Sequence, residues 1–194
     1  MLAQHPTRKR GRPVLHIPIH PDDDRDGMRR LVDTYGLRPE NYTPRADAQA
    51  AGYVAEFTLK RWLEALGANF RHYPSDWTTG TDFRIGRDQR VEMKTSTTRG
   101  ELWGDWATIL NDTRVIHDEP PDRMVFAVLC QRTNTLAVLG ACTVDQFLDH
   151  ATYVSRGKPF PHRPEKAAGH PCYVAQGCDF MQPFRAYLES VGAV

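Results

Sequence analysis

Residues 81–96 read TDFRIGRDQRVEMKTS, and the spacing of their apolar side chains predicts two antiparallel strands. Apolar and polar residues alternate over 80–85 and again over 90–96, as they do in half-buried β-strands. The four residues between these segments, 86–89, have the composition of a hairpin turn. We therefore predict a β-hairpin in this part of the chain.

The second strand of this hairpin carries two charges among apolar residues. Because side chains of a strand alternate between its faces, Glu92 and Lys94 point one way, and Val91 and Met93 point the other. Val91 and Met93 are suited to a core. Burial of a charge is costly unless the charge is paired or bound to a metal, so Glu92 and Lys94 are candidate functional residues.

The apolar residues also predict the register of the hairpin. Pairing Ile85 with Val91 and Phe83 with Met93 places all four side chains on the same face, with 87–89 as the loop. A slip by one residue would turn one strand's apolar side chains to the opposite face.

This register predicts that Asp82 lies opposite Lys94 and that Arg84 lies opposite Glu92, all on one surface. Carboxylates are hard oxygen ligands for Mg²⁺ or Mn²⁺, and the main-chain carbonyl of Met93 is a further candidate ligand. Such a metal activates water, and a nearby lysine orients that water or offsets charge on a phosphate. The group is typical of phosphodiester hydrolysis. The alternative is a solvated set of cross-strand ion pairs, which contributes only about 0–1 kcal/mol.

The remainder of the chain predicts an α/β fold with a central mixed β-sheet flanked by helices. An apolar face of Ala55, Leu59, Trp62 and Leu66 indicates a helix before the hairpin. Predicted helices cover 27–35, 45–66, 101–111, 144–150 and 180–190; further strands cover 69–73, 124–131 and 135–142; and 158–169 is predicted to be a loop. Thr143 is a candidate cap for the helix that follows it.

The 194 residues suit one domain preceded by an arm. Residues 1–44 are rich in Pro, Asp and Arg and are predicted to be a basic and polar N-terminal arm with one short helix. Residues 45–194 are predicted to form the nuclease-like domain described next.

The pattern Asp82…Glu92-x-Lys94, with a helix before it, resembles the signature of the PD-(D/E)XK nuclease superfamily. This resemblance implies a restriction-endonuclease-like core and a Mg²⁺-dependent endodeoxyribonuclease that acts on DNA. It also implies that Glu56, on the preceding helix, completes the metal site and supports catalysis. Thr81 stands where the family's name has a proline.

The resemblance covers roughly residues 46–142. Beyond that range, the chain is similar only in general style to small nucleases encoded by phages or mobile elements. By analogy with nucleases of this fold that cut two strands, a homodimer is included in the expectation.

Several cations and polar residues are candidates for contact with DNA. The string Arg8-Lys9-Arg10-Gly11-Arg12-Pro13 resembles an AT-hook, which binds narrow A·T-rich minor grooves; a solvated basic tail is the alternative. Residues after the second strand could contact phosphates or form a polar loop. The predicted nucleic-acid-binding set is Arg8, Lys9, Arg10, Arg12, Arg84, Ser96 and Arg99.

Composition excludes several classes of protein. There is no apolar run of about 18 residues and no secretory signal at the N-terminus, so we expect no membrane segment and a cytoplasmic location. The net charge of +1 does not by itself indicate a nucleic-acid partner. A zinc site of His170, Cys172 and Cys178 is an alternative use of the cysteines, although the spacing is not a standard one.

The sequence therefore predicts a metal-dependent nuclease that hydrolyses phosphodiester bonds in DNA. Two alternatives remain open. In one, the same fold has lost catalysis and serves as a DNA-binding or assembly module. In the other, the basic arm is the main functional element of a regulator, and the domain only dimerises.

Overall fold

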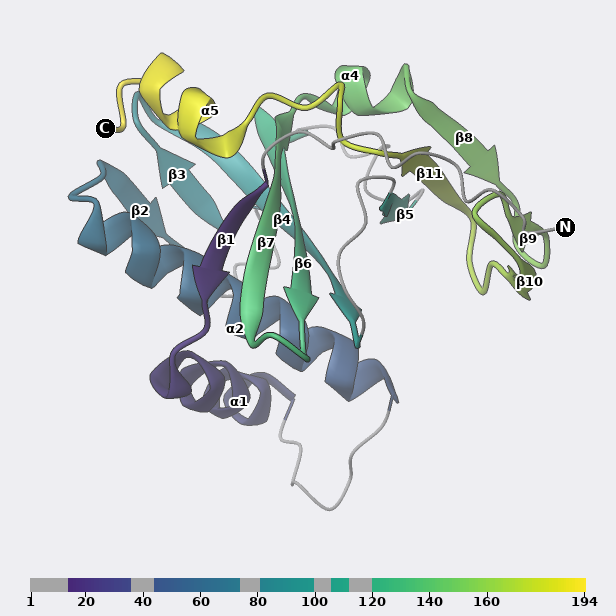
Figure 1. The fold of residues 1–194 in the computed structure, drawn as a ribbon, viewed down its shortest axis with the longest axis horizontal. Helices are drawn as coiled ribbons and strands as arrows, with labels where there is room; N and C mark the ends of the chain where they lie inside the picture. Colours follow the sequence, from purple (N-terminus) through teal and green to yellow (C-terminus); the bar gives the residue numbers. More distant parts are fainter. Residues whose placement is uncertain (1–13, 36–43, 74–80, 100–105, 112–119) are drawn as a thin grey trace, which may run out of the picture.

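The computed structural model describes residues 14–35, 44–73, 81–99, 106–111 and 120–194, which form a mixed α/β fold. A curled six-stranded sheet lies at its centre, and a three-stranded sheet and a small two-stranded hairpin lie beside it (Figure 1). The predicted α/β class with a central mixed sheet is confirmed.

The elements follow one another in an order that brings strands distant in the sequence together. They are β1 (Leu15–Pro18), α1 (Pro21–Tyr35), α2 (Pro44–Ala65), β2 (Phe70–His72), β3 (Phe83–Ile85), β4 (Gln89–Thr98), β5 (Ala107–Asn111), β6 (Arg123–Cys130), β7 (Thr135–Cys142), α4 (Val144–Leu148), β8 (Ala151–Val154), β9 (Pro159–Phe160), β10 (Arg163–Ala167), β11 (Cys172–Gln176) and α5 (Phe184–Ser190).

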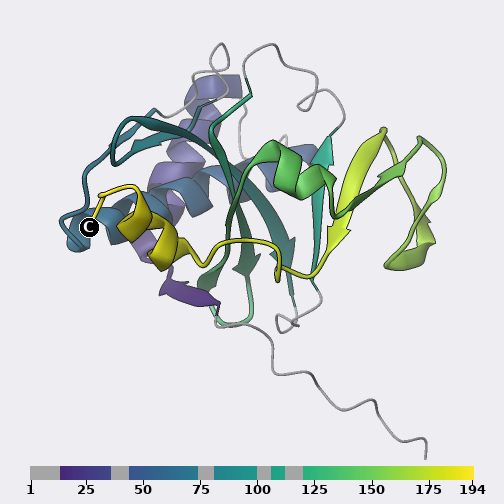
Figure 2. The same cartoon turned by 90° about the horizontal axis from the view of Figure 1, so that it is seen from above.

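The central sheet has the strand order β1-β7-β6-β4-β3-β2. β4 and β6 are parallel, whereas the other neighbouring strands of this sheet are antiparallel. The second sheet has the order β5-β11-β8 and is antiparallel. Viewed from above, β8, β11 and the β9–β10 hairpin extend to one side of the central sheet, away from α5 (Figure 2).

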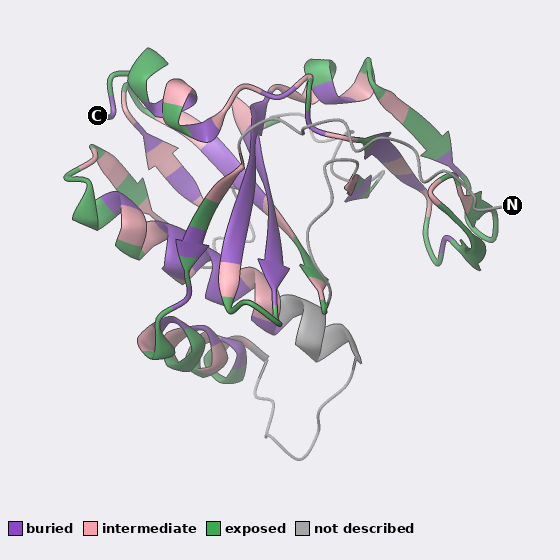
Figure 3. Ribbon diagram, in the orientation of Figure 1, coloured by how far each residue is buried: buried purple, intermediate pink, exposed green. Residues whose placement is uncertain are grey.

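Helix α2 covers one face of the central sheet because its apolar side chains recur at helical spacing. Ala55, Leu59 and Leu63 have no exposed surface and belong to the same core cluster as Phe83 and Val91. The inner strands and the sheet-facing part of α2 are accordingly buried (Figure 3). This face carries the larger of the two main core clusters and fixes where α2 sits.

The opposite face of β6 packs against α4 and the second sheet. Phe126 of β6 stacks on Phe147 of α4 with ring centroids 5.1 Å apart, and Leu110 of β5 joins the same cluster. The predicted cap is confirmed, because the Thr143 hydroxyl accepts the main-chain N–H of Gln146.

Helix α1 is held tightly to α2. A Cβ on Gly27 would lie 2.7 Å from Cγ2 of Val54 and 2.8 Å from its main-chain nitrogen, so the contact requires glycine. The carboxylate of Asp23 accepts Nε–H of Arg61 at 2.7 Å and the main-chain N–H of His20 at 2.9 Å. The two helices therefore form one layer.

The helix predicted over 101–111 is wrong for its second half, because Ala107–Asn111 forms strand β5 and pairs with β11. Thr108 and Leu110 are buried and Ile109 is exposed, an alternation with the period of a strand. A short apolar run fits either period, and its partner strand is more than 60 residues away along the chain. Residues 101–105 lie outside the described part.

Other expectations need correction near the ends of the chain. The segment predicted to be an arm contains β1, which pairs with β7, and α1 begins at Pro21 rather than near residue 27. The predicted loop over 158–169 contains β9 and β10. β8 and β11 were also missed, and α5 begins at Phe184 rather than near residue 180. Prolines and charges obscure the strand pattern in these short segments.

None of the described helices is both long and apolar enough to cross a membrane.

Candidate active site

The β3–β4 hairpin has a register two residues away from the predicted one. Phe83 pairs with Val91 and Ile85 pairs with Gln89, so the pairings of Ile85 with Val91 and of Phe83 with Met93 are wrong. A shift by two residues leaves every side chain on the same face, so the apolar pattern could not distinguish the two registers.

In the observed register, the turn of the hairpin is formed by residues 86–88. Gly86 and Asp88 have φ angles of +61° and +68°, and a Cβ on Gly86 would lie 2.3 Å from the carbonyl oxygen of Val191. A side chain at residue 86 would therefore clash with the chain after α5. Arg84 pairs with Asp88 across this turn rather than lying opposite Glu92.

Asp82 lies immediately before β3 and is fixed to β4 by two main-chain contacts. Its N–H donates to the carbonyl of Val91 at 3.0 Å, and its Oδ2 accepts the N–H of Met93 at 2.6 Å. Among the described strands, β4 has no partner on this side beyond Val91. The Asp82 carboxylate therefore sits where β4 leaves β3.

Glu92 and Lys94 follow on β4, on the face predicted from the alternation. Glu92 is only 6% exposed, and its carboxylate contacts the ammonium of Lys94. Lys94 keeps 23% of its side chain exposed and lines a cavity. A buried acid and a partly accessible base are thus adjacent on one strand.

Glu56 reaches this region from α2, as the resemblance implied. It is 9% exposed, and its Oε2 lies 3.5 Å from Nε2 of His72 on β2. The His72 ring stacks on Phe83 with centroids 4.8 Å apart and meets Phe57 edge-on. These contacts hold His72 against the carboxylate.

The carboxyl groups are poorly compensated electrostatically. Burial raises the pKa of Asp82 to about 7, and the nearby Glu56 and Glu92 raise it too, against the opposing effects of the Met93 N–H and of Lys94. The three acids therefore influence one another although they come from α2, the segment before β3, and β4.

Glu56 and His72 both favour their neutral forms. Burial raises the pKa of Glu56 to about 7, although Lys94 and Arg30 act in the opposite direction. Burial lowers the pKa of His72 to about 4, with the carboxylate of Asp82 opposing the change. The region thus contains more buried acid than its cations neutralise.

A hard divalent cation suits this donor set. The carboxylates of Glu56, Asp82 and Glu92 are oxygen ligands of the kind that Mg²⁺ and Mn²⁺ prefer. A cation would also offset the repulsion between acids that adds to the effect of burial in raising the pKa values of Glu56 and Asp82. Within the described ranges, however, no three His, Cys, Asp or Glu side chains are already grouped closely enough to hold a metal ion. Binding would require these side chains to move closer together than they lie in this structure.

The same result bears on the alternative zinc site. His170, Cys172 and Cys178 are all described, and they do not form a group that could hold a metal. Cys172 and Cys178 are instead buried and belong to different core clusters.

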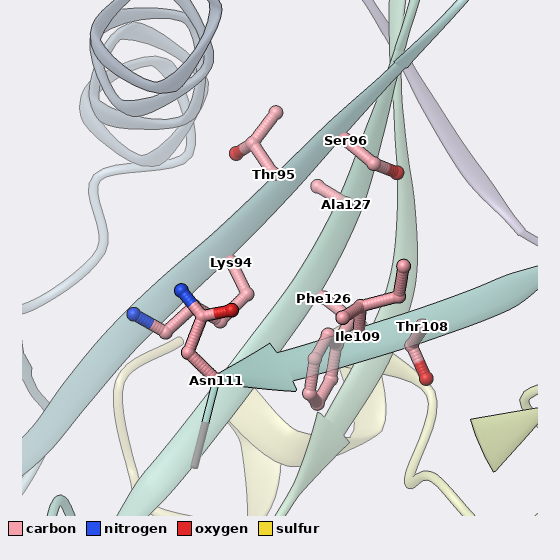
Figure 4. A pocket seen from close by; sticks show the side chains of 8 residues that line it. All are labelled: Lys94, Thr95, Ser96, Thr108, Ile109, Asn111, Phe126 and Ala127. Carbon is pink, nitrogen blue, oxygen red and sulfur yellow. The ribbon is translucent and has the colours of Figure 1, made fainter. Parts of the chain in front are cut away.

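A cavity of about 310 Å³ opens beside Lys94, between β4 and β6 of the central sheet and β5 of the second sheet. Lys94 and Asn111 line it and appear at the same end in Figure 4, while Ile109 and Phe126 provide apolar surface. Its volume is at the lower end of the range for ligand sites, roughly 300–1,000 Å³.

The other predicted nucleic-acid contacts are scattered. Ser96 lines the cavity, and its hydroxyl accepts Nε1–H of Trp106 at 3.1 Å. Arg99 is exposed just after β4. The predicted arm contacts Arg8, Lys9, Arg10 and Arg12 lie outside the described residues.

Sequence reasoning missed three residues of this region. His72 contacts Glu56, Arg30 of α1 acts on the pKa values of Glu56 and His72, and Asn111 lines the cavity next to Lys94. The position of each of these residues in the site depends on how α1, β2 or β5 packs. No local spacing in the sequence predicts that packing. A correct prediction of a strand over 107–111 would have indicated only that Ile109 and Asn111 share a face.

No protein-family model matches the sequence, and no curated protein matches it at a significant level.

Proposed function

We propose that the protein is a nuclease that hydrolyses phosphodiester bonds in DNA with Mg²⁺ or Mn²⁺. One observation carries the proposal: Glu56, Asp82 and Glu92 gather from three segments beside Lys94, and burial raises the pKa of two of these acids to about 7. Clustered acids with perturbed pKa values cost stability and are typical of functional sites.

The arrangement of elements supports a restriction-endonuclease-like core. Helix α2 is followed by the antiparallel strands β2, β3 and β4, and β6 then pairs with β4 in parallel. The connection between β4 and β6 contains strand β5 where the resemblance led us to expect a helix.

Asp82 and Glu92 would hold the metal ion, with Glu56 and the main-chain carbonyl of Met93 as the other proposed ligands. The bound ion would supply positive charge to stabilise the phosphate and a lowered pKa for water. Because Asp82 already accepts the N–H of Met93 through Oδ2, its Oδ1 is the atom that we assign to the metal.

Lys94 has the second chemical role. Lys94 contacts Glu92, and its ammonium would orient water and stabilise charge on the phosphate if Glu92 held a metal ion. In the overall hydrolysis, the water oxygen bonds to phosphorus and one bridging P–O bond breaks. The released sugar oxygen gains a proton. Lys94 lines the accessible cavity, so a phosphate could reach its ammonium.

Cleavage of DNA tests this proposal. Wild-type protein is incubated with supercoiled plasmid and with linear single- and double-stranded DNA, in Mg²⁺, Mn²⁺ or EDTA. Lys94→Ala should lose at least about 100-fold in rate, because a positioned charge at the reacting phosphate contributes roughly that much. Lys60→Ala is the matched control, since Lys60 lies on α2 and pairs with Glu64.

Each outcome distinguishes the candidates. Metal-dependent cleavage that is lost in Lys94→Ala and kept in Lys60→Ala supports the nuclease. Binding of DNA without cleavage by any combination of metal and substrate would instead support the inactive DNA-binding module.

A further inference from the structure

A second feature of the molecule, the β9–β10 hairpin, has no part in the site described above. We define residues 155–170 as the basic hairpin. It extends from the second sheet at the end of the molecule opposite α5 (Figures 1 and 2). Its two strands pair through Phe160 with Arg163 and Pro159 with Ala167, with an irregularity between these pairs.

The basic hairpin is anchored at its base. The N–H of Gly157 donates to the carbonyl of Ala168, and the N–H of Ala168 donates to the carbonyl of Lys158, each at 2.8 Å. Phe160 packs against a small core cluster that includes Ala168 and Val174. These contacts and three prolines restrict the backbone of the hairpin, which lowers the entropy cost of ordering it against a partner.

The basic hairpin is strongly positive. It carries Arg156, Lys158, Arg163 and Lys166 against the single acid Glu165, although the whole chain has a net charge of only +1. All five side chains belong to exposed residues, and β10 is exposed along its length (Figure 3). A rigid, exposed and cationic projection suits a polyanion.

Its cations also differ from many elsewhere in the chain in having no ion-pair partner among the described residues. Arg25, Lys60 and Arg61 each form an ion pair with a carboxylate on α1 or α2. None of the four cations of the basic hairpin forms an ion pair with a described residue. Their charge is therefore available to an external anion without breaking an existing contact.

We propose that the basic hairpin binds the phosphate backbone of double-stranded DNA outside the segment that is cleaved. This inference rests on the proposed function, and it adds a second contact that positions the substrate. Contacts to phosphates supply affinity that does not depend on base sequence, and each contact releases a counterion. Affinity contributed by the hairpin therefore falls as salt rises.

The test measures binding of a fluorescent 30-base-pair duplex by anisotropy, in EDTA, over a series of KCl concentrations. The full chain is compared with Arg163→Gln/Lys166→Gln and with the control Arg87→Gln/Arg185→Gln. Both double variants remove two exposed positive charges that form no ion pair with a described residue. The control charges lie next to β3 and on α5, at the other end of the molecule (Figure 1). The net charge is thus the same in both.

We expect Arg163→Gln/Lys166→Gln to weaken binding about tenfold or more at 0.1 M KCl and to reduce the salt slope by roughly 2, as for two lost phosphate contacts. The control should stay within about twofold of wild type. A second hairpin variant, Arg156→Gln/Lys158→Gln, should weaken binding in the same direction. An unchanged melting temperature shows that each variant folds.

Equal effects of the hairpin and control variants would overturn the inference, since only total charge would then matter. Unchanged binding in both hairpin variants, or no binding by wild type, would also overturn it. The proposed function is judged separately by metal-dependent cleavage. If wild type cleaves DNA and the hairpin variants bind normally, the nuclease proposal stands and this inference fails. If binding depends on the hairpin but no cleavage occurs, this inference stands and the nuclease proposal fails.

Discussion

Two aspartates of this protein, the buried Asp23 and the half-buried Asp82, have opposite surroundings. Asp23 of α1 has no exposed surface, and its carboxylate accepts hydrogen bonds from Arg61, Thr58 and the main chain of His20. Asp82 accepts one from the N–H of Met93, and other acids stand nearby. Burial desolvates both carboxylates, although Asp82 remains partly exposed, and only Asp23 has an arginine in direct contact.

The difference separates a structural acid from a candidate functional one. Asp23 joins α1 to α2, and its charge is balanced within the fold. Around Asp82, the nearby Glu56 and Glu92 raise its pKa, and Lys94 opposes them only in part. A divalent cation would balance the second group and would have no role in the first.

The largest expected effect is on catalysis. Asp82→Asn should lower the rate of plasmid nicking in Mg²⁺ by at least about 1,000-fold, since it removes a proposed metal ligand while keeping the side chain's shape and an acceptor for the Met93 N–H. Nicking rates and circular dichroism spectra are measured together. A folded Asp82→Asn protein that cuts at the wild-type rate would contradict the assignment.

Asp23→Asn should produce the reverse result. We expect a loss of about 1–3 kcal/mol in the free energy of unfolding, because Arg61 loses its ionic partner while remaining 44% exposed to water. Urea denaturation measures this loss. The rate of nicking per folded molecule should stay near that of wild type, and a large fall in that rate would place Asp23 in the site after all.

A smaller effect should appear in the pH dependence of stability without metal. The pKa of Asp82 is raised from 3.8 to about 7 in the folded protein, so its contribution to stability is full below pH 4 and is lost as pH rises through 7. His72 acts in the opposite sense, since its pKa falls from 6.5 to about 4 and its contribution is lost as pH falls through that range.

Comparing wild type with Asp82→Asn isolates the carboxyl group. In EDTA, the melting temperature of Asp82→Asn relative to that of wild type should rise between pH 5 and pH 8. A constant difference for Asp82→Asn across this range would mean that the Asp82 carboxyl is already ionised at pH 5 at no cost.

The sequence predicts the central residues of the site because their placement is local. Strand alternation puts Glu92 and Lys94 on one face. An error of two residues in the register does not change the face on which a side chain lies. His72 and Arg30 could not be predicted, because they approach Glu56 only through the packing of β2 and α1 on α2. Local patterns do not carry that information.

The same distinction between local patterns and long-range packing explains which elements of the fold could be predicted. The long apolar strands β6 and β7 and the helix α2 were predicted within a few residues, since each has a strong period. The five-residue strand β5 and the strands of the basic hairpin were not. Their pairing depends on distant partners or on prolines and charges that mimic a loop.

Direct binding of Mn²⁺ tests the central claim, that the acids beside Lys94 form a metal centre. Free Mn²⁺ is followed by electron paramagnetic resonance during titration of wild type, Asp82→Asn and Asp23→Asn at pH 8. We predict saturable binding by wild type and Asp23→Asn, and at least about tenfold weaker binding by Asp82→Asn, since one charged ligand is lost. Equal affinity in Asp82→Asn and wild type, or no binding by folded wild type, would contradict the account.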